Sequence, residues 1–248
     1  MTPNINADLK PETLEEKHEN RVPLTLAHPL AQSQIDAASR FLADGWESEE
    51  LVQLKETFPE RYDAFRIKAI VLNALFHTNV IAIYKVSELL ENLLKNTDTA
   101  GRHLVEELVH RIKKKTRRAH YSFVAKFCHF FVDSNLPILD SYAEEMAAWH
   151  LVEQARSKKS GRYLRFCENI DTLRKLASLA CRSAELDTYL WVAGEYRAWL
   201  KNNKHQISSD LRPLFEKLDT PDQWQNYPEN EQARLRNLRD LLGPIKRT

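Results

Sequence analysis

The chain has 248 residues, of which 29% are charged and 43% hydrophobic, and its formal net charge is +1. This length is enough for two modest hydrophobic cores, since domains commonly hold about 100–200 residues, and the balanced charge excludes a uniformly basic nucleic-acid binder. No apolar run approaches the roughly 18 residues that span a bilayer, and three cysteines are too few for a disulfide framework or a four-cysteine iron–sulfur cluster.

The N-terminal segment MTPNINADLKPETLEEKHEN is polar and contains prolines. It predicts a flexible tail over residues 1–22, because so few apolar side chains cannot offset the entropy of ordering the backbone. The segment has neither a basic start followed by an apolar stretch nor a small-residue cleavage site, so no secretory signal is visible. We therefore expect a cytoplasmic protein.

The rest of the chain predicts an all-α fold. Helical periodicity is clear over residues 69–76, 81–94, 103–112 and 122–131, and it returns in SYAEEMAAWHLVEQA, RYLRFCENIDTLRKLASLA, DTYLWVAGEYRAWL and NEQARLRNLRDLL. Hairpin signals are absent apart from Asp44-Gly45, and most glycines lie between periodic segments, where helices end. About ten helices with short connections are expected.

A basic run precedes the helix predicted at 122–131. RIKKKTRR gathers the cations Arg111, Lys113, Lys114, Lys115, Arg117 and Arg118. Such a run can neutralise several DNA phosphates and give salt-dependent binding. It can equally be a solvated helix end, where cations interact favourably with the helix dipole. The run alone leaves both interpretations open.

The helix that follows has an apolar face and a polar stripe. At about 100° per residue, the phenylalanines of SFVAKFCHFF fall on one side. The stripe, at positions i, i+4, i+7 and i+11, consists of Ser122, Lys126, His129 and Asp133. Lys126 lies at the border of the two faces, where its amine is partly shielded from water. A lysine so placed can act as a nucleophile or as a cation in a cleft, or it can be a snorkelling surface residue.

A further helix is predicted to begin near Asp140, after Pro137. Ser141 with Glu144 three residues later fits a capping box, and Asp140 is itself a plausible N-cap or lies next to it. A carboxylate at a helix start is fixed in space by backbone N–H groups. If the connection DSNLPIL folds back, Asp140 approaches Lys126 across a cleft.

The segment from Lys126 to Asp140 comprises a helix after a basic run, then Pro-Ile-Leu-Asp-Ser and a second helix. It resembles the helix–hairpin–helix DNA glycosylase superfamily in a divergent form. The later DTYLWVAGEYRAW is similar to a motif of bacterial members, and the resemblance covers the middle third to half of the chain. The glycine-containing hairpin turn of the family, which holds a phosphate, is replaced here by Lys-Thr-Arg-Arg-Ala-His, and the spacing from Lys126 to Asp140 is shorter than usual. Side chains such as Arg117, Arg118 or His120 would therefore hold the phosphate.

The resemblance implies a glycosylase that flips a base out of double-stranded DNA and needs no cofactor. Asp140 would stabilise the oxocarbenium-like sugar or activate water, and Lys126 could attack the sugar and add lyase activity. The residues expected around the base are Tyr121, Ser122, His129, Tyr142, Trp149 and Trp191. Both tryptophans are also good core candidates. Bacterial relatives are associated with defence against phage, so a hypermodified base, such as glucosylated hydroxymethylcytosine, is a substrate suggested by analogy.

The expected architecture is two helical lobes with a cleft between them. One lobe would span residues 35–135 and end in the hairpin-like element, and the other would combine residues 23–34 with 136–248, with Asp140 at the cleft. Two other classes of function stay open. One is a non-catalytic nucleic-acid-binding module that uses residues 111–118, and the other is a helical protein-binding scaffold.

A metal site is a weaker candidate on the helix at 103–112. The side chains that share one face there are His103, Glu106, Glu107 and His110. The Glu107-x-x-His110 spacing occurs in four-helix di-metal carboxylate proteins, but those proteins need the same motif on another helix. No other predicted helix carries it, so we expect no metal.

Overall fold

The computed structural model describes residues 25–43, 49–60, 62–203, 207–243 and 245. Throughout this part of the chain the regular structure is helical, which confirms the all-α prediction; the β-pairing that is present is an isolated bridge between Leu26 and Leu151. No helix in these ranges is both long and apolar enough to cross a membrane. The predicted tail at 1–22 and the Asp44-Gly45 turn lie outside the described residues.

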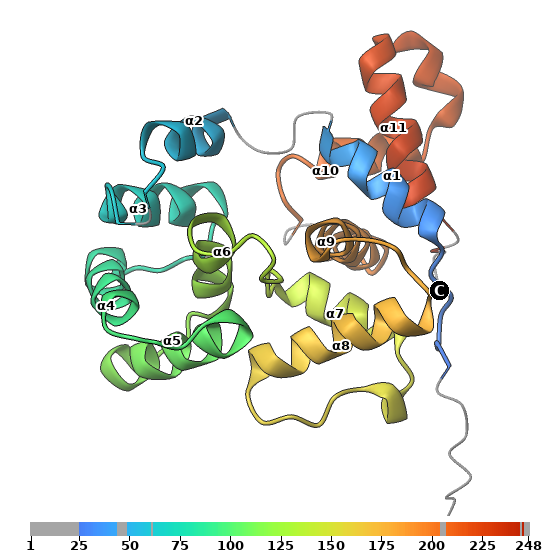
Figure 1. Ribbon diagram of the computed structural model, residues 1–248. Helices are drawn as coiled ribbons and strands as arrows, with labels where there is room; N and C mark the ends of the chain where they lie inside the picture. Colours follow the sequence, from blue (N-terminus) through green and yellow to red (C-terminus); the bar gives the residue numbers. More distant parts are fainter. Residues whose placement is uncertain (1–24, 44–48, 61, 204–206, 244, 246–248) are drawn as a thin grey trace, which may run out of the picture.

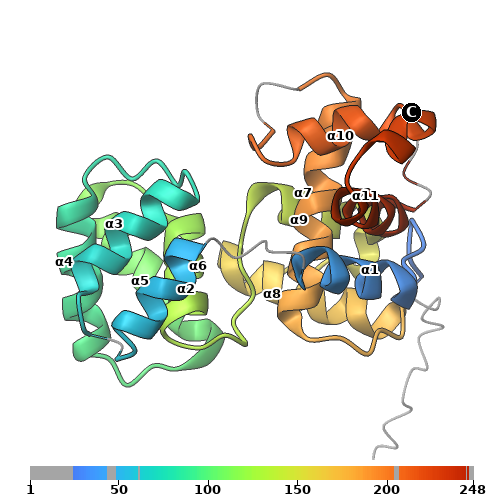
Figure 2. The ribbon, with the colours of Figure 1, turned by 90° about the horizontal axis from the view of Figure 1, so that it is seen from above.

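The helices form two lobes, which Figure 2 shows side by side. The first lobe consists of α2 (Glu49–Thr57), α3 (Phe65–Leu75), α4 (Ile83–Lys95), α5 (Gly101–Thr116) and α6 (Tyr121–Phe131). Helix α6 packs against α3 and α5, and Phe123 and Phe127 are buried as the periodicity predicts. The ring of Phe127 lies 4.6 Å from that of Phe65 on α3. The apolar face of α6 is therefore the centre of this lobe.

The second lobe is built around α9 (Ser183–Leu200) (Figure 1). Helix α9 packs against α1 (Gln32–Ala43), α7 (Ser141–His150) and α11 (Glu229–Leu242), while α8 (Arg162–Leu176) packs on α7 and α10 (Arg212–Leu218) on α11. Short 3-10 helices at Glu153–Ala155 and Pro221–Asn226 complete it. Tyr189, Leu190 and Val192 of α9 are fully buried, so this helix is the core of the lobe.

The boundary between the lobes differs from the predicted one at residue 35. Helix α1 packs against α9 and α11, and Gln34 Nε2 donates a hydrogen bond to the carbonyl of Leu241. Its buried residues Ile35, Ala38 and Phe41 thus belong to the second lobe, and the first begins at α2. The periodicity of a helix shows that it has an apolar face, but not which helix covers that face.

Gly194 allows α7 and α9 to approach each other closely. A Cβ atom added at Gly194 would lie 2.5 Å from the carbonyl oxygen of Tyr142 in the first turn of α7. We predict that Gly194→Ala lowers the free energy of unfolding by about 1–3 kcal/mol, the usual cost of overpacking. Alanine is otherwise favoured over glycine inside a helix by about 1 kcal/mol. Urea unfolding of both proteins tests this, and a more stable variant would show that the close contact does not exist.

Candidate functional site

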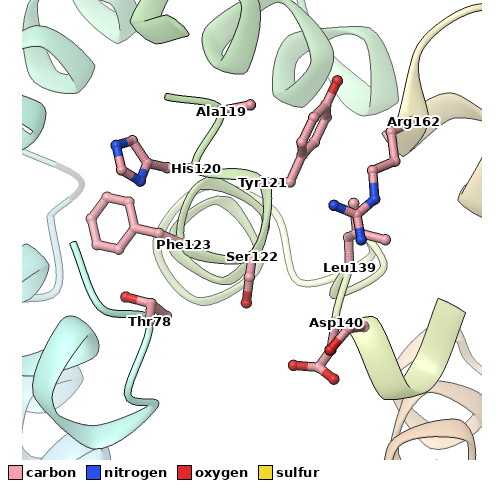
Figure 3. A pocket seen from close by; sticks show the side chains of 10 residues that line it. Thr78, Ala119, His120, Tyr121, Ser122, Phe123, Leu139, Asp140 and Arg162 are labelled. Carbon is pink, nitrogen blue, oxygen red and sulfur yellow. The ribbon is translucent and has the colours of Figure 1, made fainter. Parts of the chain in front are cut away.

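A pocket of about 230 Å³ lies where the two lobes meet. Its walls are formed by Thr78 before α4, by residues 119–123 at the start of α6, by residues 139–141 at the start of α7, and by Arg162 of α8. In Figure 3, Thr78 and His120 lie on one side, Asp140 and Arg162 on the other, and Ser122 between them. Hydroxyl, imidazole, carboxylate and guanidinium groups thus line one small cavity.

The structure brings Lys126 and Asp140 together. Lys126 Nζ lies 3.3 Å from Asp140 Oδ2 and donates a hydrogen bond of 2.9 Å to Ser122 Oγ. The side chains of Lys126 and Asp140 are 9% and 20% exposed. Lys126 Nζ also lies 5.7 Å from the centre of the Phe76 ring. Asp140 and Ser122 are thus part of the pocket wall, and the Lys126 ammonium contacts both of them.

Asp140 is the N-cap of α7. Its Oδ1 accepts a hydrogen bond of 2.9 Å from Tyr142 N, while its Oδ2 faces Lys126. The other prediction, a capping box of Ser141 and Glu144, is wrong, because the helix begins one residue earlier and Glu144 Oε2 instead accepts two hydrogen bonds from Arg162. The two carboxylate oxygens of Asp140 thus have different partners, one backbone and one cationic.

The connection between α6 and α7 folds back because both lobes anchor it. The His129 ring Nδ1 lies 2.8 Å from the carbonyl oxygen of Leu136, and Tyr163 OH donates a hydrogen bond of 2.8 Å to the carbonyl of Pro137. Ile138 N donates to the carboxylate of Asp187 on α9. These contacts hold the backbone that leads into Asp140. They also explain why His129 contributes to the connection and not to the pocket wall.

The predicted polar stripe on α6 is shorter than its spacing suggested. The helix ends at Phe131, so Asp133 lies beyond it, and its Oδ1 accepts a hydrogen bond of 2.9 Å from Asn135 N in the following turn. Ser122 and Lys126, one turn apart, are the part of the stripe that reaches the site. A helix projection is valid only as far as the helix continues.

Two of the six predicted base-pocket residues line the cavity, namely Tyr121 and Ser122. Tyr121 OH donates a hydrogen bond of 2.6 Å to Glu106 Oε1 on α5. Burial, together with that carboxylate, raises the pKa of Tyr121 to about 12. The Arg162 guanidinium lies 5.7 Å from the centre of the Tyr121 ring. Tyr121 is therefore uncharged at neutral pH, and its partly buried ring lines the pocket.

Among the described residues, the other four predicted base-pocket residues lie outside the cavity wall; they are His129, Tyr142, Trp149 and Trp191. Trp149 lies near the C-terminal end of α7, about 13 Å along the helix from Asp140. It stacks on His28 with a centroid distance of 3.8 Å, and Trp191 packs partly buried against the core of the second lobe. Burial, and after it the charges of Glu195, Asp140 and Glu145, raises the pKa of Tyr142 to about 12.

The basic run leads directly into the pocket. Its lysines lie exposed on the last turn of α5, and Arg117, with a φ of 62°, reverses the chain toward α6. Arg111 pairs with Glu107 at 2.5 Å. Two residues after Arg118, His120 lines the cavity, and its pKa is lowered by burial and by the charge of Arg118. The exposed cations of the run thus end two residues before His120, a polar residue of the pocket wall.

Glu106 joins the two lobes, a role that its sequence pattern did not indicate. Its Oε2 accepts a hydrogen bond of 2.9 Å from Tyr163 N at the start of α8, while its Oε1 accepts from Tyr121. A Cβ added at Gly161 would lie 2.7 Å from the Glu106 carboxyl carbon, so only glycine lets the carboxylate reach the helix end. Within the described ranges, no three His, Cys, Asp or Glu side chains are arranged to hold a metal ion.

A family model named HI_0787_N and described as an N-terminal domain matches residues 36–135. The match is less than half of the chain. It covers most of α1 and the whole first lobe with Lys126, and it ends in the connection before Asp140. No curated protein and no solved structure matches the chain.

Proposed function

We propose that this protein is a DNA glycosylase that releases a damaged or modified base by cleaving its N-glycosidic bond. The observation that carries the proposal is the position of the Asp140 carboxylate. It is fixed by the start of α7, is paired with Lys126, and lines a polar pocket between two helical lobes. The resemblance to helix–hairpin–helix glycosylases assigns the same pair of residue types to the reaction.

The reaction breaks the bond between the sugar C1′ and the base nitrogen and forms a bond from C1′ to a water oxygen. Positive charge develops on the sugar as the base leaves, and a fixed carboxylate beside it stabilises that charge. Asp140 would also accept the proton that the attacking water loses. The departing nitrogen takes up a proton from solvent or from a pocket group.

Lys126 would act in a second pathway. Its Nζ donates to Ser122 Oγ and pairs with Asp140, so it has no lone pair to attack with until it transfers a proton to Asp140 Oδ2, which lies 3.3 Å away. The neutral amine could then attack C1′, displace the base and form a Schiff base with the opened sugar. Elimination of the 3′ phosphate from that intermediate would cut the strand.

The basic run would bind the DNA backbone. We predict that replacing Lys113, Lys114 and Arg118 by glutamine weakens DNA binding and makes the negative slope of log K against log salt shallower, by about 0.9 for each phosphate that the run no longer neutralises. Fluorescence anisotropy at several salt concentrations measures both quantities. A matched triple variant that neutralises the exposed Lys85, Lys175 and Arg236 on other helices is the control. Equal effects of the two triple variants would contradict a specific role for this run.

The pocket supports a substrate base that carries polar substituents. Hydroxyl groups of Thr78, Ser122 and Ser141 and the guanidinium of Arg162 line it, and these groups can hydrogen-bond to hydroxymethyl or sugar substituents. A hypermodified phage base such as glucosylated hydroxymethylcytosine is accordingly our proposed substrate. The enzyme would act on double-stranded DNA in the cytoplasm, without a cofactor, in defence against phage.

A non-catalytic nucleic-acid-binding module is the second candidate, and the exposed cations of the 111–118 run favour it. An incision assay separates the two functions. The protein is incubated with genomic DNAs that carry ordinary, damaged or hypermodified bases, and the DNA is then treated with alkali to cut abasic sites. Alkali-dependent breaks that vanish with Asp140→Asn support a glycosylase. Salt-dependent binding without breaks on any of these DNAs supports the binding module.

A further inference from the structure

A second carboxyl lies close enough to Lys126 and Asp140 to interact with the charges of both. Asp187, in the first turns of α9, is 6% exposed, and its Oδ2 accepts a hydrogen bond of 2.8 Å from Ile138 N. Ile138 lies two residues before Asp140 in the segment that connects the lobes. Asp187 therefore anchors, from the core of the second lobe, the backbone that carries Asp140 into the pocket.

The other oxygen of Asp187, Oδ1, is buried without a hydrogen-bond partner among the described residues. An ionised carboxylate with an unsatisfied oxygen away from water is costly, whereas a protonated carboxyl carries no charge to solvate. Desolvation raises the pKa of Asp187 to about 8; the hydrogen bond from Ile138 and the charge of Lys126 lower it, and the charge of Asp140 raises it. Geometry and electrostatics both favour the neutral acid at neutral pH.

The titratable groups that face Asp187 come from several elements. Lys126 on α6 and Asp140 at the start of α7 act on it with their charges. Tyr163 and Cys167 on α8 and Cys181 before α9 also interact with it. Burial raises the pKa of each of these three, that of Cys167 to about 12, so they are uncharged at neutral pH. Of these groups, Lys126 and Asp140 therefore set the local charge.

We propose that Asp187 is a positioning residue for the Lys126–Asp140 pair: as a neutral acid it anchors the 136–140 segment and leaves Asp140 as the carboxylate that pairs with Lys126. The catalytic importance of this positioning rests on the proposed function, whereas the anchoring does not. Two neighbouring carboxyls held in different protonation states can take different roles in one reaction. Ionisation of Asp187 would add a buried charge that competes for Lys126 and loosens the segment carrying Asp140.

Thermal unfolding across pH tests the neutral acid without any need for activity. In the unfolded chain Asp187 titrates near the ordinary aspartate pKa of 3.8, and in the folded protein its pKa is about 8. Between these values the folded state binds one more proton, so this residue lowers stability as pH rises. Asp187→Asn keeps an acceptor for Ile138 N but cannot ionise. Its Tm should rise relative to the wild type by about 4 °C per pH unit from pH 5 to 8 and then level off. A difference in Tm that stays constant from pH 5 to 8 would show that Asp187 is not a neutral acid in the folded protein.

The pH profile of base release tests the positioning role. Wild-type activity should fall about tenfold per pH unit above pH 8, as expected for loss of one essential proton. Asp187→Asn should remove this decline, and Asp187→Leu, which lacks the acceptor for Ile138 N, should lose activity at every pH while still folded. An unchanged profile in Asp187→Asn would overturn the positioning role. A wild type that releases no base, combined with the expected Tm trend, would refute the proposed function and the catalytic role together, and would leave the neutral anchor standing.

Discussion

Substitution of Asp140 by asparagine is expected to lower the rate of base release by about 10²–10⁴-fold, the usual contribution of a positioned acid–base group. Asparagine is as good an N-cap as aspartate, so its side-chain oxygen can still accept the hydrogen bond from Tyr142 N and start α7. The change therefore keeps the helix cap but removes the negative charge at the pocket wall and the charge partner of Lys126. Initial rates of alkali-revealed strand cleavage measure the effect.

The control for this prediction is Ser141→Ala. Ser141 lines the same pocket, but Asp140 supplies the cap, so its removal should leave the fold intact and change the rate far less. Anisotropy should give the same DNA affinity for wild type and Asp140→Asn within a factor of about three, since this carboxylate makes no attractive contact with phosphate. If Asp140→Asn releases base at the wild-type rate, the carboxylate has no catalytic role.

Loss of the Lys126 amine is expected to abolish covalent trapping on DNA. A Schiff base can be reduced by borohydride to a stable protein–DNA adduct, and Lys126 is the amine paired with the proposed catalytic carboxylate. In Lys126→Ala the adduct and all alkali-independent breaks should disappear. The variant should also be destabilised by about 1–3 kcal/mol, because it leaves a partly buried carboxylate without its cation.

Lys126→Arg separates charge from nucleophilicity. Arginine keeps a cation for Asp140 but does not form a Schiff base with a sugar aldehyde, so hydrolytic base release should persist while trapping is lost. If trapping survives in both variants, another amine is the nucleophile. If neither the wild type nor the variants can be trapped, Lys126 acts only as the charge partner of Asp140.

The sequence was most informative where function depends on local pattern. The period of apolar residues identified the helices, the phenylalanine face of α6 was correctly assigned to a core, and the Asp140 cap followed from residue type and position. The approach of Lys126 to Asp140 was predicted on the condition that the connection DSNLPIL folds back, and in the structure the two side chains are paired. Lys126 and Asp140 are only 14 residues apart in the sequence, so the length of the connection limits how far apart they can lie.

Contacts between residues far apart in the sequence could not be predicted in this way. Glu106 and Tyr163 are 57 residues apart, and Ile138 and Asp187 are 49 apart, so nothing in their local sequence indicates that they meet. The same reason explains why α1 was assigned to the wrong lobe and why Trp149 and Trp191 were placed at a pocket whose wall, among the described residues, does not include them. The residues that anchor a site are chosen by the tertiary fold, and residue type alone does not identify them.

The most direct test of the proposed activity is mass spectrometry of the free bases released from hypermodified DNA. Wild type and Asp140→Asn are incubated with matched DNAs that carry plain cytosine, hydroxymethylcytosine or its glucosylated form, and the small-molecule fraction is analysed. We predict a free modified base that accumulates with time in the wild type and is absent with Asp140→Asn. If the wild type releases no base from these DNAs or from DNA with damaged bases, while it still binds them, the glycosylase proposal is wrong.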